Sequence, residues 1–304
     1  MRRSQRILIT GASGLLGGNM IHRWAPEHEL LGLDRNPFGG YPVAQVDLLD
    51  WDRVTRLVRE FEPTVILNAA AMANVDGCEK DPEAARAMNV DLVGTLAELA
   101  RESEAALVHI STDQVFNGES DTLYTEEDAP SPINEYGRSK LAGERAALEY
   151  KGSLVVRTNI FGWNLARNKG SFGEWLYDLF EERREATLFT DVFFTPIYIG
   201  ALIEGIEAAL DRGLTGVLHL AGATSLSKDA FGRLLAEEMG REHSQVRSGS
   251  LGDVALTAPR PKHMSLSSAR FEELTGVSVP RAEQSIRRFL SDREALPVAR
   301  DKEQ

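Results

Sequence analysis

The sequence predicts an α/β protein built on a doubly wound parallel sheet, with a smaller, irregular α+β lobe in its C-terminal half. Three observations predict this fold class. Short apolar segments alternate with amphipathic helical segments from the first residues onward, a glycine-rich turn follows the first apolar segment, and the alternation loosens after about residue 159. Strands joined by crossover helices lie parallel, so the alternation indicates a sheet of the Rossmann type.

Each expected strand is a short apolar run, and each expected helix has apolar residues at helical spacing. The first strand is 6–10, whose sequence RILIT is typical of a strand that is buried on both faces. The other strands are expected at 29–34, 64–68, 105–110, 153–157 and, more briefly, 216–220. The helices are expected from the glycine turn to about 24, and at 51–61, 82–102, 134–150, 171–184, 197–211, 227–240 and 281–292.

Composition argues against several kinds of site. The 304 residues include 34 Lys and Arg against 46 Asp and Glu, and this net charge of −12 argues against bulk nucleic-acid binding. The single cysteine, Cys78, excludes an intrachain disulfide and a multi-cysteine zinc site, and the six histidines show no metal-ligand spacing. No apolar run reaches the length of a membrane span. We therefore expect a soluble, cytoplasmic protein that binds no metal, membrane or nucleic acid.

The glycine-rich turn Gly11–Gly17 joins the first strand to the first helix. Gly11 permits a tight turn, Gly14 lets the backbone approach a pyrophosphate, and Gly17 lets the helix pack closely on the strand. The helix N-terminus adds free N–H groups and the positive end of a dipole. The pattern predicts dinucleotide binding, with an ordinary strand-to-helix turn as the alternative. Its glycines are spaced three and then three residues apart, whereas the usual fingerprint has two and then three.

Two acidic residues between the first two expected helices fit the same cofactor. Asp34 ends the second strand, where a carboxylate binds ribose hydroxyls and repels a 2′-phosphate, which favours NAD. The adjacent Arg35 could accept that phosphate, so NADP stays open. Asp47 could accept a hydrogen bond from the adenine amino group, or it could cap the following helix. Residues 1–159 are therefore expected to form a dinucleotide-binding domain, with helix 197–211 packed back onto it, and 160–304 mainly a substrate-binding lobe.

Tyr136 and Lys140 lie four residues apart on a predicted helix, hence on one face and one turn apart. A nearby ammonium favours tyrosinate, so we expect Lys140 to lower the pKa of Tyr136 from about 10 toward neutrality. The phenol could then protonate a carbonyl oxygen while a hydride reaches its carbon. Thr112, just past the fourth strand, is the candidate hydroxyl that orients the carbonyl. The alternatives are a surface pair for Tyr136 and Lys140, and a turn hydroxyl for Thr112.

Together these residues resemble the extended short-chain dehydrogenase/reductase superfamily and, within it, the dTDP-4-dehydrorhamnose reductase family. The resemblance covers nearly the whole chain, and its most specific part runs from STDQVFNG to YGRSKLAGE, which places Thr112, Tyr136 and Lys140 on the family's catalytic residues. The other matching stretches are GASGLLGG, VDLLD, VILNAAAMANVDGCE, MNVDLVGTLAELA, VVRTNIFG and APRPKHMSL.

The resemblance implies an oxidoreductase of nucleotide-sugar metabolism. It would use NAD(P)H to reduce a 4-keto group on a nucleotide-linked deoxysugar, with Tyr136 as proton donor. The nicotinamide would lie near residues 158–161. The resemblance also implies a cofactor site lined by Gly11, Ser13, Gly14, Leu15, Leu16, Asp47, Leu48, Ala69, Ala70 and Ala71.

The expected substrate side departs from the family pattern. Met72 and Ala73 stand where the family usually has Tyr-Thr, Gln114 stands where it has Tyr, and Met264 stands where it has Ser. Related dehydratases carry a glutamate base at the position of Gln114. Because an amide cannot ionise, Gln114 argues against dehydration. We place Gln114 in the substrate site, together with Asp113 and Arg260.

Other polar and aromatic residues are weaker candidates. Arg260 and Lys262 could neutralise a diphosphate or could belong to a solvated loop. Core packing is the first interpretation of His109, His219 and Cys78. It is also the first interpretation of three later aromatic residues, with stacking on a base or sugar as the alternative; these are Trp163, Phe172 and Trp175. His263 could touch substrate or belong to a loop, and 126–128 reads as a solvated acidic run.

The sequence leaves two other functions possible, and it also allows a homodimer. The altered Met72, Gln114 and Met264 would also suit a non-catalytic, dinucleotide-binding regulatory subunit. A reductase of another small carbonyl compound is the third possibility. By analogy with the superfamily, helices 82–102 and 134–150 could form a homodimer interface.

Overall fold

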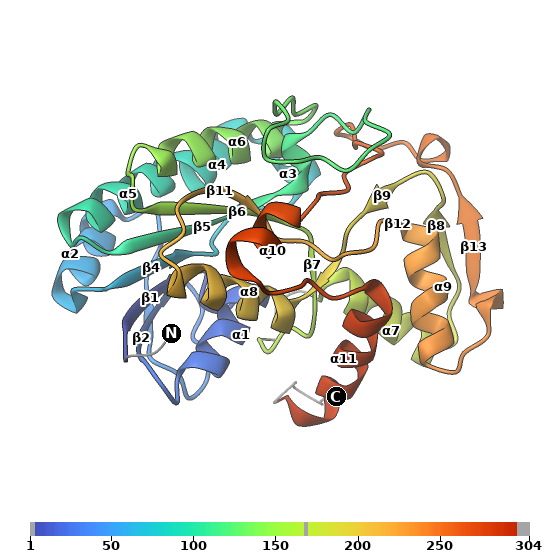
Figure 1. Cartoon of the computed structure of the whole chain (residues 1–304), viewed down its shortest axis with the longest axis horizontal. Helices are drawn as coiled ribbons and strands as arrows, with labels where there is room; N and C mark the ends of the chain where they lie inside the picture. The colour runs from blue at the N-terminus through green and yellow to red at the C-terminus, as the bar shows by residue number, and fades with distance from the viewer. Residues whose placement is uncertain (1–3, 167–169, 297–304) are drawn as a thin grey trace.

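The computed structural model describes residues 4–166 and 170–296, and within them seven strands form one parallel sheet (Figure 1). Its strand order is β11-β6-β5-β4-β1-β2-β3, which confirms the predicted doubly wound fold class. The strands are β1 (Arg6–Thr10), β2 (Glu29–Asp34), β3 (Val43–Gln45), β4 (Val65–Asn68), β5 (Ala106–Thr112), β6 (Ser153–Thr158) and β11 (Gly216–His219).

Helices cover both faces of the sheet, because successive strand residues point to opposite sides. Ile7 and Ile9 of β1 join one apolar core, while Leu8 between them joins the other. The first core packs under α1 (Leu15–Trp24) and α8 (Ile199–Asp211). The second core packs under α2 (Trp51–Phe61), α5 (Leu92–Glu102) and α6 (Glu135–Leu148). The strand order reverses between β1 and β4, which is where ligands bind in such sheets.

The region predicted as one helix over 82–102 is interrupted. Helix α4 (Pro82–Arg86) passes through a π-helical turn, Ala87–Asp91, before α5 begins. This turn brings the Asn89 carbonyl against α6 at Gly143, where any side chain would collide with it. A π turn inside a helix is often found at a functional site. The short elements β3 and α3 (Val75–Lys80) were not predicted from the sequence.

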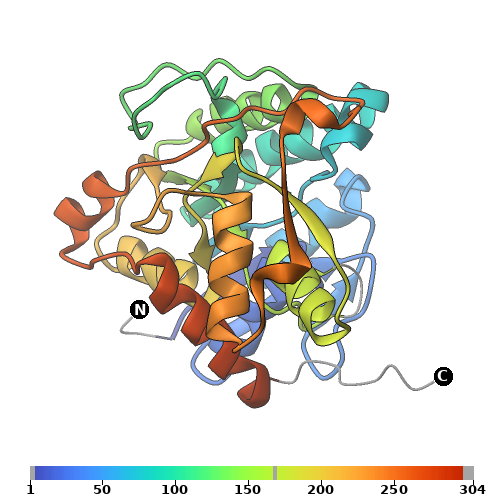
Figure 2. The ribbon, with the colours of Figure 1, turned by 90° about the vertical axis from the view of Figure 1, so that its right-hand side faces the viewer.

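The chain after β6 forms a smaller lobe, which Figure 2 shows face on. Its described part has three two-stranded pairs, β7–β10, β9–β12 and β8–β13. Aromatic rings from three of its elements pack on Phe161, with Phe231 and Phe289 both edge-on to it. The elements are β7 (Ile160–Phe161), α7 (Phe172–Glu181), β8 (Ala186–Phe189), β9 (Phe193–Phe194), β10 (Ile197–Tyr198), β12 (Leu226–Ser227), α9 (Lys228–Glu238), β13 (Val246–Gly249), α10 (Ala269–Thr275) and α11 (Ala282–Ala295).

The two regions are interleaved along the chain. Helix α8 packs beside α1, as expected for 197–211, and β11 returns to the edge of the sheet beside β6. The division at residue 159 therefore stays a proposal. Helix α8 and strand β11 follow this residue in the chain but pack with the sheet. None of the helices in the described ranges is long and apolar enough to cross a membrane.

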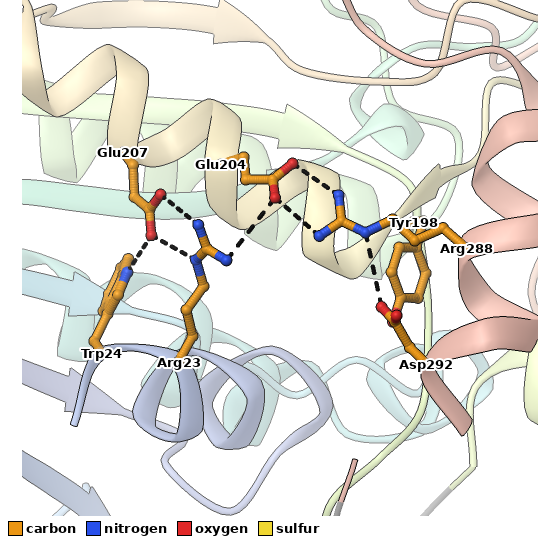
Figure 3. A network of polar contacts seen from close by, with 7 residues as sticks. All are labelled: Arg23, Trp24, Tyr198, Glu204, Glu207, Arg288 and Asp292. Atoms are coloured by element: carbon orange, nitrogen blue, oxygen red, sulfur yellow. Dashed lines mark hydrogen bonds and ion pairs between the residues drawn. The ribbon is translucent and has the colours of Figure 1, made fainter. Parts of the chain in front are cut away.

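A chain of polar contacts links α1, α8 and α11 (Figure 3). Glu207 of α8 accepts hydrogen bonds from Trp24 (2.6 Å) and from Arg23 (2.7 Å). Glu204, one turn earlier, accepts from Arg288 of α11 at 2.8 Å through both carboxylate oxygens. These arginines are about two-fifths exposed, so the network orients α11 more than it stabilises the fold.

Candidate active site

The glycine turn lies at the carboxyl end of β1, beside the point where the strand order reverses. Gly11 has φ +70°, and a Cβ there would lie 2.8 Å from the Ala70 backbone nitrogen. Gly17 packs against the Gly11 carbonyl so closely that a side chain would collide with it. Helix α1 follows Gly14 with no side-chain cap. This cradle, which a Cβ would fill, fits the pyrophosphate of a dinucleotide.

The predicted acidic residues flank this turn. The Asp34 carboxylate accepts hydrogen bonds from the backbone nitrogens of Ser13 and Asn36, both at 3.0 Å, and so fixes the turn to the end of β2. Arg35 beside it is exposed. Asp47 is exposed as well and accepts from the Leu49 nitrogen. The alternative that Asp47 caps α2 is wrong, because that cap is Asp50.

Several predicted cofactor residues can contribute only backbone to a ligand. The side chains of Leu16 and Leu48 are 5% and 6% exposed and belong to the two cores. Leu15 is half-buried. The alanines Ala69, Ala70 and Ala71 follow β4 directly and lie beside Gly11, and their exposure rises from Ala70 to Ala71.

Thr112, Tyr136 and Lys140 come together at the carboxyl end of β5. Thr112 is the last residue of β5, and its hydroxyl donates to Asp113 at 3.0 Å. Tyr136 and Lys140 lie on α6, whose first turn is capped by the Asn134 side chain. The Thr112 hydroxyl is close enough to the phenol to lower the pKa of Tyr136. The Lys140 ammonium donates to the Ile110 carbonyl of β5 at 2.7 Å.

The expected lowering of the Tyr136 pKa is wrong for this structure. Burial of the phenol is the largest influence and raises the pKa of Tyr136 to about 12. The neighbouring Asp113 carboxylate raises it further, and Lys140 is not among the described groups that act on it. The Lys140 ammonium faces β5 and is itself buried, which lowers the pKa of Lys140 to about 8.

A buried chain of hydrogen bonds runs across the sheet to Lys140. The Thr10 hydroxyl donates to the Asn68 carbonyl oxygen at 2.6 Å, and Asn68 contacts His109 Nδ1 at 3.0 Å. His109 Nε2 lies 3.3 Å from Lys140 Nζ. All four side chains are buried, and burial together with the Lys140 charge holds the pKa of His109 well below its usual value. His109 is buried as predicted, and it also positions Lys140.

A second buried network supports the end of β5. Glu144 of α6 pairs with Arg157 of β6 at 2.7 Å, and the two side chains are 2% and 4% exposed. Ser111 donates to the same carboxylate, and Arg157 lies 3.3 Å from the His219 ring. Glu126 accepts from the His219 backbone nitrogen, so this residue of the 126–128 run is not a solvated charge.

Asn89 fastens the loop after β4 to α6. Its side chain bonds both the nitrogen (2.8 Å) and the carbonyl (3.2 Å) of Met72, and it also donates to Ser139 at 2.9 Å. Sequence reasoning missed this residue, although MNVDLVGT was among the matching stretches. Cys78 donates to the same Met72 carbonyl, and burial raises the pKa of its thiol. Cys78 therefore behaves as the structural residue that was predicted.

A cavity of about 360 Å³ lies between the sheet edge and the smaller lobe. Gln114, Met264 and Arg260, which were expected on the substrate side, line this cavity. Beside it, Asp113 is 1% exposed and accepts from Asn159 at 2.5 Å. Thr158, just before Asn159, has a buried hydroxyl without a hydrogen-bond partner among the described residues.

The two predicted basic residues are already paired with carboxylates. Arg260 donates to Asp76 at 3.0 Å, and Lys262 lies 2.8 Å from Asp191. His263 stacks on the ring of Phe193. Of the aromatic candidates, Trp163 is buried in the core, whereas Trp175 is 42% exposed and lines the cavity.

Lys228, the first residue of α9, also lines the cavity and was not singled out from the sequence. Its Nζ lies 3.3 Å from the ring centroid of Phe194 and 4.6 Å from that of Phe172. Although the residue is partly exposed, burial lowers the pKa of its ammonium to about 8. Nothing in the local pattern SLSKD indicates that this lysine faces Asp113.

Comparison with known proteins identifies the family. A family model described as the RmlD substrate binding domain matches residues 5–295. The chain is 34% identical over 287 residues to the "probable low-salt glycan biosynthesis reductase Agl14" of Haloferax volcanii, covering 91% of this chain and 95% of that protein. It is 31% identical over 289 residues to methionine adenosyltransferase 2 subunit beta of Rattus norvegicus, covering 89% and 83%.

A solved structure agrees with these relatives. The dTDP-4-dehydrorhamnose reductase of Bacillus anthracis in complex with NADP superposes with a TM-score of 0.86 at 28% identity, over 95% of this chain and 99% of that one. The family model spans nearly the whole chain, residues 5–295. The chain belongs to the RmlD family of the extended short-chain dehydrogenases/reductases.

Proposed function

We propose that the protein is an NAD(P)H-dependent reductase of a 4-keto group on a nucleotide-linked deoxysugar. One observation carries this proposal: the Tyr136 phenol lies beside Thr112, on the helix that also buries Lys140, at the edge where the glycine turn opens. The names of the similar reductases support the same reaction class. Gln114 supports reduction over dehydration, because an amide cannot take a proton from carbon as a carboxylate does.

The cofactor would be held by residues on the sheet side. Gly11, Gly14 and Gly17 would receive its pyrophosphate, Asp34 and Arg35 its adenosine ribose, and Lys140 its nicotinamide ribose. When bound, the reduced nicotinamide supplies the hydride. The Asp34 carboxylate favours NADH slightly, whereas the Bacillus relative was crystallised with NADP. The shift in melting temperature with NADH and with NADPH decides between them.

The chain's own residues handle the proton and the oxygen. With a pKa of about 12, Tyr136 keeps its proton at neutral pH and can give it to a carbonyl oxygen as negative charge develops there. The Thr112 hydroxyl orients that oxygen. Lys140, with a pKa of about 8, is largely charged at pH 7. One N–H of the ammonium is donated to the Ile110 carbonyl, and the others stay available to the ribose.

A regulatory role is the second candidate, because a chain named subunit beta is among the similar proteins and three substrate-side positions are altered. The test incubates the purified protein with NADH or NADPH and a panel of dTDP- and UDP-linked 4-keto sugars, and follows oxidation of the nicotinamide. Oxidation with at least one sugar nucleotide is expected. No oxidation with any of them, combined with a stable complex with a partner enzyme, would favour the regulatory subunit.

A reductase of an unrelated small carbonyl compound is separated by competition. Free dTDP or UDP should inhibit turnover of a sugar nucleotide and should leave turnover of an unrelated carbonyl compound unchanged. A homodimer through α5 and α6 and a cytoplasmic location stay predictions from the sequence. Analytical ultracentrifugation tests the first of these.

A further inference from the structure

Lys228 is held in place before any ligand arrives. Residues Leu226 and Ser227 pair with β9, and the Lys228 nitrogen donates to the Val192 carbonyl at 3.0 Å. Ser227 caps α9 by accepting from the Ala230 nitrogen. The backbone that carries the ammonium is thus fixed by two strands and a helix start. The ammonium lies over the rings of Phe194 and Phe172, and the residue lines the cavity.

Among the described residues, the ammonium has aromatic partners but no salt bridge. Throughout the described ranges, no carboxylate lies within ion-pair distance of Lys228, and the acid that acts on it is the buried Asp113. Asp113 is already engaged by Thr112 and Asn159. A cation–π contact offsets part of the desolvation of an ammonium and leaves its N–H groups able to donate. Lys228 therefore has no direct ion pair, and its N–H groups stay available to an anion in the cavity.

The other cation on the cavity wall differs in this respect. Arg260 donates one guanidinium nitrogen to Asp76 and another to the Ala258 carbonyl. Its charge is matched within the protein, so an anionic ligand gains less from it. Of the two cations that line the cavity in the described chain, Lys228 is the one that an incoming anion would neutralise.

We infer that Lys228 receives the diphosphate of the sugar nucleotide. This inference rests on the proposed function, because it assumes a substrate whose reacting carbonyl lies at Thr112. Lys228 lines the same cavity as Gln114, two residues after Thr112, so the ammonium lies within reach of a group attached to the sugar ring. The diphosphate carries the negative charge of such a substrate, and a partly desolvated ammonium gains most from an anion. The exposed Trp175 lines the same cavity and offers a ring on which a base can stack.

The test compares ligands that differ only in phosphate. Binding of dTDP and UDP, and of thymidine and uridine, is measured by calorimetry for the wild type and for Lys228→Met. We expect the variant to bind the diphosphates about 10- to 100-fold more weakly, with nucleoside affinity unchanged. Lys228→Arg should recover much of the loss. Lys151→Met, an exposed lysine at the opposite end of β6, is the matched control and should bind all four ligands like the wild type.

Three outcomes decide the inference. Equal diphosphate affinity in wild type and Lys228→Met overturns it. A loss confined to the intact sugar nucleotide, with dTDP and UDP unaffected, also overturns it, because the contact would then be with the sugar. Weaker binding of the diphosphates alone, in a variant that melts no lower than the wild type, supports it. Wild-type turnover is measured separately, so a protein that binds dTDP through Lys228 but reduces no sugar nucleotide refutes the proposed function alone.

Discussion

The two sides of the cavity treat buried charge differently. On the sheet side, the buried charges have polar partners at close range: Glu144 pairs with Arg157, and Lys140 donates to the Ile110 carbonyl. On the side of the smaller lobe, the Lys228 ammonium rests on two aromatic rings and has no carboxylate at ion-pair distance among the described residues. The buried charges of the sheet side therefore have polar partners within the protein, whereas the Lys228 ammonium of the lobe side has aromatic ones.

The difference separates two tasks. Proton transfer needs groups fixed to fractions of an ångström, and buried hydrogen-bond networks supply such rigidity. Substrate recognition can use a charge that stays unmatched until the ligand arrives, at some cost in folding free energy. Polar substitutions on the sheet side should therefore cost stability, whereas those on the lobe side should cost ligand affinity.

The largest effect is expected at the buried ion pair. Arg157→Met leaves the Glu144 carboxylate buried without its cation, so the free energy of unfolding should fall by about 3–5 kcal/mol. Urea denaturation measures it. Arg59→Met is the matched control, because its pair with Glu102 is exposed and should contribute less than about 1 kcal/mol.

The double variant Arg157→Met, Glu144→Leu should recover part of the loss, since no charge is then left unpaired. If Arg157→Met and Arg59→Met lowered the free energy of unfolding equally, the claim that the sheet side depends on its buried ion pair would be wrong.

A smaller effect is expected at His109. His109→Leu leaves the Asn68 amide short of an acceptor and should cost about 1–3 kcal/mol, while His109→Gln should cost less because its side-chain oxygen can still accept. Turnover should fall in both variants, more in the leucine one, because Lys140 loses its orientation.

The pH dependence of folding stability tests whether His109 is buried in its neutral form. The pKa of His109 is held below its usual value, so below about pH 6.5 the unfolded chain binds a proton that the folded one does not. The stability of the wild type should therefore fall relative to His109→Gln as the pH is lowered through this range. Parallel stability curves for the two proteins would show that His109 is not buried in its neutral form.

The smallest stability effect is expected at Lys228. The pKa of Lys228 is about 8 in the folded chain and 10.5 in the unfolded chain, so between these values the unfolded chain binds more protons. The charged lysine therefore lowers the free energy of unfolding at pH 7, and this cost shrinks as the pH rises. Lys228→Met should melt at the same or a higher temperature at pH 7, and the difference should shrink as the pH rises. A clearly lower melting temperature would make Lys228 a structural residue.

The sheet side could be predicted from the sequence because its signals are local. Apolar runs fix the strands, and the residues that follow them, such as Gly11 and Thr112, must then lie at one edge of the sheet. The helix carrying Tyr136 and Lys140 follows from its spacing and from the Asn134 cap. The π turn at Ala87–Asp91 could not be predicted, because it depends on packing against Gly143.

The contacts of the smaller lobe and the pKa values of the buried groups could not be predicted, because they depend on tertiary contacts. The pairing of Arg260 with Asp76 joins residues far apart in the chain, and so does the approach of Lys228 to Asp113. The prediction for the pKa of Tyr136 was wrong because it counted the neighbouring ammonium and not the burial of the phenol. Sequence spacing gives proximity along a helix, but it does not give desolvation.

The central claim is that the Tyr136 phenol donates the proton in a carbonyl reduction. The most direct measurement is the turnover of Tyr136→Phe with a sugar nucleotide that the wild type reduces, beside the melting-temperature shift that NAD(P)H produces in both proteins. We predict a loss of turnover of at least about 100-fold with the cofactor-induced shift retained. Turnover close to that of the wild type in a variant that still binds the cofactor would contradict the account.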